Sequence, residues 1–327
     1  MAVIFSHCLR SPLSSFSSSL LTASVQSSRL SRPRSISVSV SASTTPFRME
    51  LDNNEGRGNF IEFPYVSSPH KKLMVDLVSM VEIRLGSQLL PSTLPPDAQY
   101  YQNHSDTSHA SLHIRSGHPS SPIDFILGSW IHSQLPNGGA LNITSLSTYL
   151  KSSTDSPNLL MEFISSSPTS LVLILDILPR KDLALHPDYL KKFYEDTKLE
   201  AQRQVLEKVP EVKPYFSPSL YIRASVSPTV IAARIECEAV ERMEEIIKDH
   251  VGVVAKQVLQ TWLDTCAVVD NGEEVDESEK EYLQKRDMMV RSKSIEIDLT
   301  SSLPRLFEPE TADRMIATIQ KYFSASS

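Results

Sequence analysis

The sequence predicts an α/β protein of the α+β type: a single-domain α/β/α sandwich in which helices flank both faces of a central, mainly antiparallel sheet. Three observations indicate this class. Short β-type runs follow one another in the middle of the chain, the turns between them are short, and helical patterns occur before, between and after the runs. Short turns join antiparallel neighbours, because a parallel crossover needs a dozen residues or more. Helices at several points along such a sheet are expected to cover both of its faces.

The strands are predicted from short apolar and β-branched runs that are bounded by turn residues. They are expected at residues 110–115, 123–133, 140–146, 159–165, 170–177, 220–226, 230–236 and 294–299. The first five are separated by turn clusters at residues 116–121, 135–139, 152–158 and 166–169. Residues 91–109 are polar and contain prolines, so they are expected to form a loop.

The helices are predicted from apolar side chains at helical spacing. They are expected at residues 72–85, 187–209 and 238–267, after the acidic stretch 273–281, and from about residue 310 onward. No internal repeat and no long linker divides this part of the chain. Residues 49–327 are therefore expected to form one domain.

Residues 1–48 are predicted to be a disordered chloroplast transit peptide. Between residues 1 and 47 there is no Asp, Glu or Lys, and four arginines are scattered through a serine-rich stretch. This composition is typical of organelle transit peptides, whereas a secretory signal needs a continuous apolar core. Residues 14–21 are interrupted by serines and do not supply one. The expected location is the chloroplast stroma, with mitochondria as a second location and a leader without targeting value as the alternative.

The charge and hydropathy of the chain exclude two classes of function. Removal of residues 1–48 takes away five arginines and moves the formal net charge from -7 to -12. Nucleic-acid binding depends on a basic face that neutralises phosphates, so no nucleic-acid partner is expected. No apolar run reaches the ~18–20 residues of a membrane helix, so no transmembrane segment is expected.

The glycines and cysteines argue against a bound redox cofactor. The chain has 9 glycines, and its one G-x-G, at residues 56–58, follows no predicted strand. The three cysteines, Cys8, Cys237 and Cys266, form no C-x-x-C pair that would suit a metal or an iron–sulfur cluster. No G-x-S-x-G elbow of a hydrolase is present either. We expect neither a cofactor nor a metal, so a redox reaction would need electrons from an outside donor.

The histidines do not predict a metal site. His109 and His113 lie four residues apart on or beside an expected strand, where that spacing covers about 13 Å. They cannot bind one ion together, and both are expected to be structural or surface residues. His132 is expected to be a hydrogen-bonded histidine within the sheet.

Carboxylates inside apolar strands are the best candidates for chemistry. Burial raises the pKa of a carboxyl group and makes it a potential proton donor. Glu162 lies in an apolar run, although an edge position with its side chain in water is the alternative. Asp124, Asp176, Glu296 and Asp298 are similarly placed, and as strand residues Glu296 and Asp298 would share one face.

Two further features are candidates for binding. Residues 213–219 hold Tyr215 and Phe216 between prolines, which predicts either one wall of an apolar cavity or a plain rigid turn. Basic pairs at residues 180–181, 191–192 and 285–286 are typical of a solvated face. On so acidic a protein they are also candidates for docking an acidic electron carrier.

Several runs of residues resemble the red chlorophyll catabolite reductase family of plants. They are EFPYVS at 62–67, LHIRSG at 112–117, SPIDF at 121–125 with GSWIH at 128–132, SLVLILD at 170–176, RKDL at 180–183, HPDYLK at 186–191 and KSIE at 293–296. The resemblance extends from about residue 60 to the C-terminus.

The resemblance implies an oxidoreductase of chlorophyll breakdown in senescence. Such an enzyme reduces a double bond of red chlorophyll catabolite, an open-chain tetrapyrrole, to the primary fluorescent catabolite. It also implies that reduced ferredoxin supplies the electrons, that the enzyme has no prosthetic group, and that it is similar to the ferredoxin-dependent bilin reductases. The expected partners are a second copy of the chain in a homodimer, pheophorbide a oxygenase and other enzymes of the pathway. The alternative function is a non-catalytic tetrapyrrole-binding protein that sequesters the catabolite; a third reading is a protein without a ligand.

The resemblance also implies which residues form the site. Substrate-binding positions of the family fall on Glu162, Tyr215, Phe216, Ser217 and Asp298, and the two acids are the candidates for catalysis. Each acid would either donate a proton or hold the pyrrole nitrogens. The position of Val226 is linked in the family to the epimer of the product. Ile297 stands where a relative carries an acid, which leaves Glu296 as a weaker alternative to Asp298.

Overall fold

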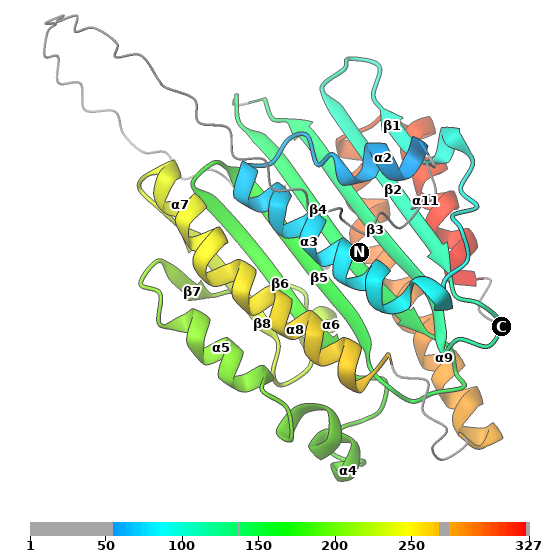
Figure 1. The fold of residues 1–327 in the computed structure, drawn as a ribbon. Helices are drawn as coiled ribbons and strands as arrows, with labels where there is room; N and C mark the ends of the chain where they lie inside the picture. The colour runs from blue at the N-terminus through cyan, green and yellow to red at the C-terminus, as the bar shows by residue number, and fades with distance from the viewer. Residues whose placement is uncertain (1–54, 137, 268–274, 325–327) are drawn as a thin grey trace, which may run out of the picture.

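The computed structural model describes residues 55–136, 138–267 and 275–324. The predicted transit peptide, its boundary at residue 48 and Cys8 lie outside these residues. Three layers are visible in Figure 1: a broad twisted sheet, one group of helices in front of it and a second group behind it. This arrangement confirms the predicted α/β/α sandwich with a central antiparallel sheet.

All neighbouring strands of the eight-stranded sheet are antiparallel. The strands are β1 (Tyr100–Gln102), β2 (Ser108–Ser116), β3 (Ile123–Gln134), β4 (Ala140–Leu150), β5 (Asn158–Ser167), β6 (Ser170–Leu178), β7 (Val212–Pro214) and β8 (Ile231–Glu236). Their order is β1-β2-β3-β4-β5-β6-β8-β7. Strands β2 to β6 are consecutive, as the short turns predicted, and β5 lies near the centre of the sheet.

Helices cover both faces of the sheet. In front lie α2 (Glu55–Ile61), α3 (Ser68–Leu85), α4 (Pro187–Leu190), the π-helical η3 (Lys191–Glu195), α5 (Leu199–Glu207), α7 (Val240–Ile246), the π-helical η4 (Ile247–Val251) and α8 (Gly252–Thr265). Behind lie α6 (Leu220–Ser225), α9 (Glu277–Ser294), the π-helical η5 (Ile295–Leu299), α10 (Thr300–Ser302) and α11 (Pro309–Ser324). Three 3₁₀ turns complete the described elements: η1 (Gly86–Gln88), η2 (Pro96–Ala98) and η6 (Leu303–Arg305). We call the two sides of the sheet the α3/α8 face and the α6/α9 face.

Alternation along each strand separates the two hydrophobic cores. In β5 the side chains of Leu159, Met161 and Phe163 enter the core under α3 and α8. Leu160 and Ile164 enter the core beneath η5 and α11, and Glu162 lies between them on that same α6/α9 face. The strand pattern therefore decides which face receives this carboxylate.

Two of the predicted strands are helical, and both predictions were wrong. Residues 220–226 form α6 and its C-cap, with the Ser219 hydroxyl accepting a hydrogen bond from the N–H of Ile222. Residues 294–299 continue α9 as η5, in which Ile295, Asp298 and Leu299 are buried. The run Ile-Glu-Ile-Asp-Leu alternates like a strand, but burial at positions 295, 298 and 299 satisfies a helical period equally well.

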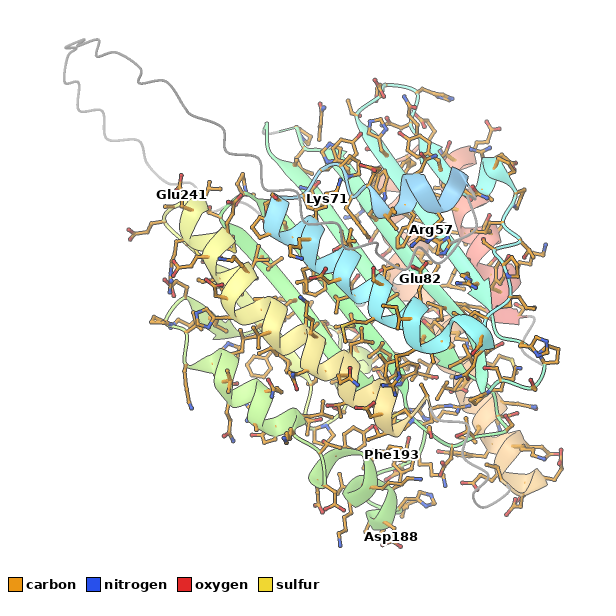
Figure 2. All side chains as sticks on the ribbon, viewed as in Figure 1. Arg57, Lys71, Glu82, Asp188, Phe193 and Glu241 are labelled. Atoms are coloured by element: carbon orange, nitrogen blue, oxygen red, sulfur yellow. The ribbon has the colours of Figure 1, made fainter. Side chains whose placement is uncertain are left out.

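Other elements differ from the predictions mainly in their extent. The predicted helix 187–209 is interrupted between η3 and α5, and the predicted loop 91–109 contains η2, β1 and the start of β2. Helix α2 was not predicted. Its Arg57 forms a two-pronged ion pair of 2.7 and 2.6 Å with Glu82 of α3, and Figure 2 shows the two side chains facing each other. The ring of Phe60 lies on Gly128, where a Cβ atom would be only 2.4 Å from the ring.

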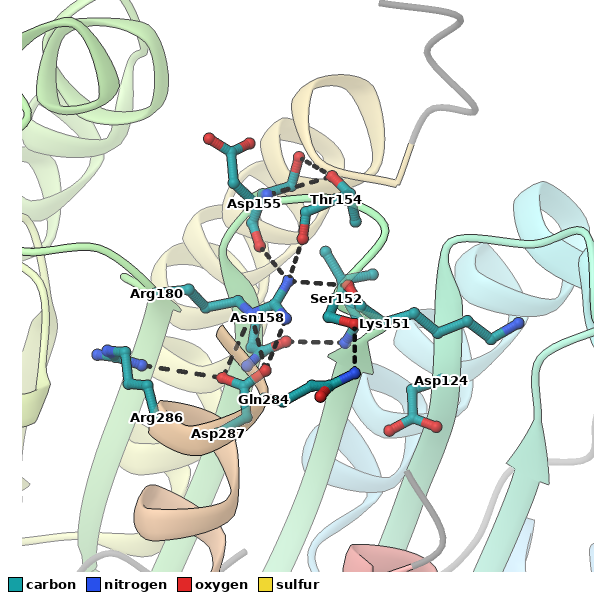
Figure 3. Close-up of polar contacts among 12 residues, drawn as sticks. Asp124, Lys151, Ser152, Thr154, Asp155, Asn158, Arg180, Gln284, Arg286 and Asp287 are labelled. Atoms are coloured by element: carbon teal, nitrogen blue, oxygen red, sulfur yellow. Dashed lines mark hydrogen bonds and ion pairs between the residues drawn. The ribbon is translucent and has the colours of Figure 1, made fainter. Parts of the chain in front are cut away.

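A buried ion pair fixes α9 against the end of the sheet (Figure 3). The fully buried Arg180 donates to both carboxylate oxygens of Asp287 and to three backbone oxygens of the turn between β4 and β5. A buried guanidinium needs this many acceptors to offset its desolvation. The prediction that residues 180–181 lie on a solvated face is therefore wrong for Arg180, and Lys181 is itself paired with Asp155 at 2.6 Å.

Candidate active site

Two adjoining pockets lie beside α6 on the α6/α9 face. The larger has a volume of about 490 Å³ and lies between β8, α6 and the segment after β7, and it is also lined by Arg203, Leu206 and Glu207 of α5, a helix of the opposite face. The smaller, of about 40 Å³, lies between β4, β5, α6 and the α9–η5 helix. Ile222 and Val226 line both pockets, so the end of α6 separates them. Val226, which the resemblance implies is a site residue, lies between the two pockets, and its role at the site stays a prediction.

Glu162 lies under this face in the centre of the sheet. Glu162 is 0% exposed, so the alternative of an edge residue with its side chain in water is wrong. In the register of the sheet it faces Ser145 on β4, whose hydroxyl is 2.8 Å from that of Ser129 on β3. A row of small polar side chains thus crosses the centre of an otherwise apolar sheet face.

Asp298 approaches Glu162 from the helical side. It is 1% exposed, lines the smaller pocket, and lies in η5. Burial first, and the nearby charge of Glu162 second, raise the pKa of Asp298 to about 8. At neutral pH this group is therefore mainly a protonated acid.

Glu296 does not share the position of Asp298. Side chains two positions apart in a helix point in different directions. Glu296 instead forms an exposed ion pair of 2.6 Å with Lys293. The expectation that the two acids share one face was wrong, because it depended on a strand. Glu296 is thereby removed as an alternative to Asp298.

Two buried polar atoms of the smaller pocket have no hydrogen-bond partner among the described residues. They are Oδ1 of Asp298 and Oγ of Ser147, a residue on β4. A buried polar group without a partner is costly, and such groups concentrate where a ligand binds. The sequence analysis missed Ser147, because one serine in a strand carries no signal of its own.

Asp176 has a structural contact instead of a pocket position. Its carboxylate accepts hydrogen bonds from the N–H of Ser227 at 2.9 Å and from the hydroxyl of Ser227 at 2.5 Å. Burial raises the pKa of Asp176 to about 6, although these hydrogen bonds oppose the shift. Because Ser227 directly follows Val226, the carboxylate fixes the wall between the two pockets.

The predicted aromatic segment lines the larger pocket. Tyr215, Phe216 and Ser217 all contribute to its wall. The N–H of Tyr215 donates to Ala232 O at 2.9 Å, and the residue is buried. Phe216, by contrast, is 75% exposed at the opening. Of the two interpretations of residues 213–219, a cavity wall and a plain rigid turn, the structure favours the cavity wall.

The remaining candidates have structural surroundings. Asp124 is paired with Arg291 of α9 at 2.9 Å. The ring of His113 stacks on Phe60, and His132 stacks on Tyr65 with its Nδ1 2.7 Å from Asn142 Oδ1. Across residues 55–136, 138–267 and 275–324, no three His, Cys, Asp or Glu side chains gather as they would around a metal ion. The structural interpretation of these histidines agrees with their contacts.

Arg291 and Tyr149 are further pocket residues that the sequence analysis missed. Both line the smaller pocket, and the guanidinium carbon of Arg291 lies 4.9 Å from the centre of the Tyr149 ring. Burial raises the pKa of Tyr149 to about 12. An arginine within a charged helix is usually solvated, so only the packing of α9 on the sheet reveals this contact.

The arrangement suits proton delivery to an apolar ligand. Asp298, whose pKa is raised by burial and by the charge of the nearby Glu162, lines the smaller pocket, whereas Glu162 is buried in the sheet and lines neither pocket. None of the helices in the described part of the chain is long and apolar enough to cross a membrane.

Comparisons with solved structures define the class of fold. The structure is similar to that of phytochromobilin synthase from tomato, solved in complex with biliverdin, with a TM-score of 0.61 and 18% sequence identity over 79% of this chain and 85% of that one. The chain therefore shares the fold of this synthase.

Comparisons of sequence define the family. The family model described as red chlorophyll catabolite reductase matches residues 69–321. The chain is 49% identical to "Red chlorophyll catabolite reductase, chloroplastic" of Arabidopsis thaliana, over 99% of both chains. It is 48% identical to "Red chlorophyll catabolite reductase 1, chloroplastic" of Oryza sativa subsp. japonica, over 79% of both chains. The chain belongs to the red chlorophyll catabolite reductase family, which confirms the resemblance.

Proposed function

We propose that the protein reduces red chlorophyll catabolite to the primary fluorescent chlorophyll catabolite with electrons from reduced ferredoxin. The observation that carries this proposal is the buried pair of Glu162 and Asp298 beside the pockets. Membership of a family of reductases supports the reaction class. The bilin-reductase fold supports an open-chain tetrapyrrole as the ligand.

Reduction of one carbon–carbon double bond needs two electrons and two protons. Each reduced ferredoxin supplies one electron and is oxidised once, so two ferredoxins are consumed for each product. Electron uptake makes the conjugated tetrapyrrole more basic, and a positioned acid can then protonate carbon. Asp298 is suited to this role, because its raised pKa keeps it protonated at neutral pH.

Glu162 is suited to the complementary role. A carboxylate accepts hydrogen bonds from pyrrole N–H groups, and such charge-assisted bonds are stronger than neutral ones. A negative charge held at Glu162 also keeps the proton on Asp298. We therefore assign ligand orientation to Glu162 and proton delivery to Asp298.

The remaining site residues shape the space around the rings. Tyr215, Phe216 and Ser217 form the wall of the larger pocket, and Val226 stands where the two pockets meet. The side chain at position 226 then limits how the new stereocentre lies against the proton donor. We propose that Val226 and the segment 215–217 together decide the epimer of the product.

Location and partners form part of the same proposal. The relatives from Arabidopsis and rice are named chloroplastic, which supports a chloroplast protein. The stroma, an additional mitochondrial pool, a homodimer, the absence of a bound cofactor and association with pheophorbide a oxygenase stay predictions.

The decisive test is an anaerobic assay of the full chain with red chlorophyll catabolite and reduced ferredoxin as the only additions. We expect a blue-fluorescent product that is absent when ferredoxin is omitted, and chromatography identifies its epimer. Tight binding of the catabolite without product would contradict the reductase and favour the sequestering protein.

A further inference from the structure

Positive charge gathers at the outer end of the sheet, on the α6/α9 face. Lys213 of β7 and Arg234 of β8 are directly opposite each other in the antiparallel register. Their neighbours Val212, Ala233 and Ile235 enter the opposite core, so both cations lie on the α6/α9 face. Like charges directly opposite on paired strands destabilise a sheet. Arg234 also has partners within the fold, because its guanidinium carbon lies 5.7 Å from the centre of the Tyr215 ring and the side chain is paired with Glu236, whereas Lys213 projects from the edge strand.

A third cation lies on the same side of the sheet. Arg223 of α6 is exposed and lines the larger pocket. The acids in this region are engaged: Glu207 is paired with Arg203 at 2.5 Å, and Glu236 is paired with Arg234 itself at 3.8 Å. The described residues provide no acidic partner within 4 Å for Lys213 or Arg223.

Exposed apolar side chains lie between these cations along the chain. Phe216 is 75% exposed and Leu220 is 72% exposed. Both belong to the segment that runs from the end of β7 to the start of α6, along the opening of the larger pocket. Protein interfaces commonly combine an apolar, aromatic centre with a charged rim.

We propose that Lys213, Phe216, Leu220, Arg223 and Arg234 form the docking surface for a small acidic one-electron carrier protein, the ferredoxin of the proposed reaction. This inference rests on the proposed function. A chain whose net charge without residues 1–48 is -12 repels an acidic partner over most of its surface, so a local basic patch directs the encounter. A carrier at this place is next to the opening of the pocket that holds the substrate.

Two of the three basic pairs weighed in the sequence analysis are weaker docking candidates; the third, at residues 285–286, lies on α9, and its Arg286 lines the smaller pocket. Arg180 is buried, and Lys181 is engaged with acids. Lys191 and Lys192 lie in η3, whose Phe193 packs into the core of the opposite face. They are exposed, like Lys213, but no pocket residue of the candidate site is among their neighbours on η3. Lys191 is therefore a matched control.

The test compares Lys213→Glu, Lys213→Arg, Arg234→Gln and the control Lys191→Glu in the full chain. Turnover is measured against ferredoxin concentration at low and high salt, and separately with reduced methyl viologen, a small donor that needs no protein interface. We expect Lys213→Glu to raise the KM for ferredoxin by about tenfold at low salt, with a smaller effect at high salt. Arg234→Gln should raise it less, and Lys213→Arg and Lys191→Glu should keep it unchanged.

Turnover with methyl viologen should be unchanged in Lys213→Glu, which shows that the variant is folded and that its substrate pocket is intact. An unchanged KM for ferredoxin in Lys213→Glu would overturn the docking surface while leaving the proposed function in place. An increase in the KM for ferredoxin in Lys191→Glu alone would place the docking surface on the opposite face of the sheet. No reduction of the catabolite by wild-type protein with either donor would overturn the proposed function itself, and the docking surface with it.

Discussion

The two faces of one sheet differ in whether they hold buried acids. On the α3/α8 face, Leu173, Trp262 and their neighbours form a continuous apolar core, and the buried His70 is satisfied by Thr144 at 2.9 Å. On the α6/α9 face, the core is interrupted by the buried acids Glu162 and Asp298. Pockets occur on both faces, because a further one of about 340 Å³ lies between α3 and α7 on the α3/α8 face. The same strands contribute to both faces, so the difference arises from alternate residues and from the helices that cover them.

This difference separates stability from chemistry within one sheet. An apolar core stabilises the fold in proportion to the apolar area that it buries. A face with buried acids gives up part of that stabilisation and gains groups of shifted pKa, as functional sites commonly do. Variants on the two faces should therefore have opposite phenotypes.

The largest effect is expected on turnover, from the acids of the α6/α9 face. Asp298→Asn and Glu162→Gln should each lower kcat by about 10²–10⁴-fold, the usual contribution of a positioned acid or base. Thermal unfolding should stay cooperative, because Glu162→Gln removes a buried charge, Asp298→Asn replaces a protonated acid, and both changes keep the shape of the side chain. Glu296→Gln is the matched control two residues from Asp298, and steady-state kinetics should find its kcat unchanged. An equally large loss of kcat in Glu296→Gln would contradict the assignment of Asp298 as the proton donor.

The opposite face should show the reverse pattern. Trp262→Ala removes a fully buried ring whose Nε1–H donates to Pro157 O at 2.9 Å. It should lower the free energy of unfolding by about 3–5 kcal/mol, as large core truncations do. Denaturant titration measures this, and the folded fraction should keep its wild-type KM for the catabolite. A raised KM at full folding would show that the two faces are coupled.

The pH dependence tests the state of Asp298. If its protonated form delivers the proton, kcat should fall about tenfold per pH unit above a pKa of about 8. Its folded pKa is raised from 3.8, so the folded state holds the proton more tightly than the unfolded chain. The stabilising contribution is complete below the unfolded pKa and is lost as the pH rises through the folded value. Unfolding at several pH values should show this decline, and Asp298→Asn should remove it.

The smallest effect is expected at the wall between the pockets. Ser227→Ala removes the hydroxyl that donates to Asp176 at 2.5 Å but keeps the backbone donor. The free energy of unfolding should fall by about 1 kcal/mol, and the pKa of Asp176 should rise further. Because Val226 precedes this residue, the ratio of product epimers should also change, which chromatography measures. Ser227→Thr keeps the hydroxyl, so its free energy of unfolding and its ratio of product epimers should equal those of the wild type. If neither quantity changes in Ser227→Ala, Asp176 has no role at the wall.

Local pattern predicted the sheet accurately. The runs that became β2 to β6 alternate or are continuously apolar, and turn residues separate them, so neighbouring residues alone specified both strand and antiparallel pairing. The same reasoning failed at α6 and η5. Short apolar runs fit a strand and a buried helical turn equally well, and the surface on which they pack decides between them.

The candidate site shows the same division. An apolar run marked Glu162 as a buried acid, and family resemblance marked Asp298 and the segment 215–217. Neither revealed that Ser147 and Arg291 line the same pocket, or that Glu296 points away. These facts depend on which sides of α9 and η5 face the sheet, and the Arg180–Asp287 pair, between residues 107 positions apart, helps to fix that orientation.

The sequence by itself determined the sheet, the class of fold and the family, because these depend on periodicity and on motifs that neighbouring residues carry. Only the tertiary structure decided that Asp298 lies near Glu162 and that the pKa of Asp298 is raised to about 8. The physical reason is that desolvation and the repulsion between two carboxyl groups depend on distance in space. Those distances are set by packing between segments that are far apart in the chain.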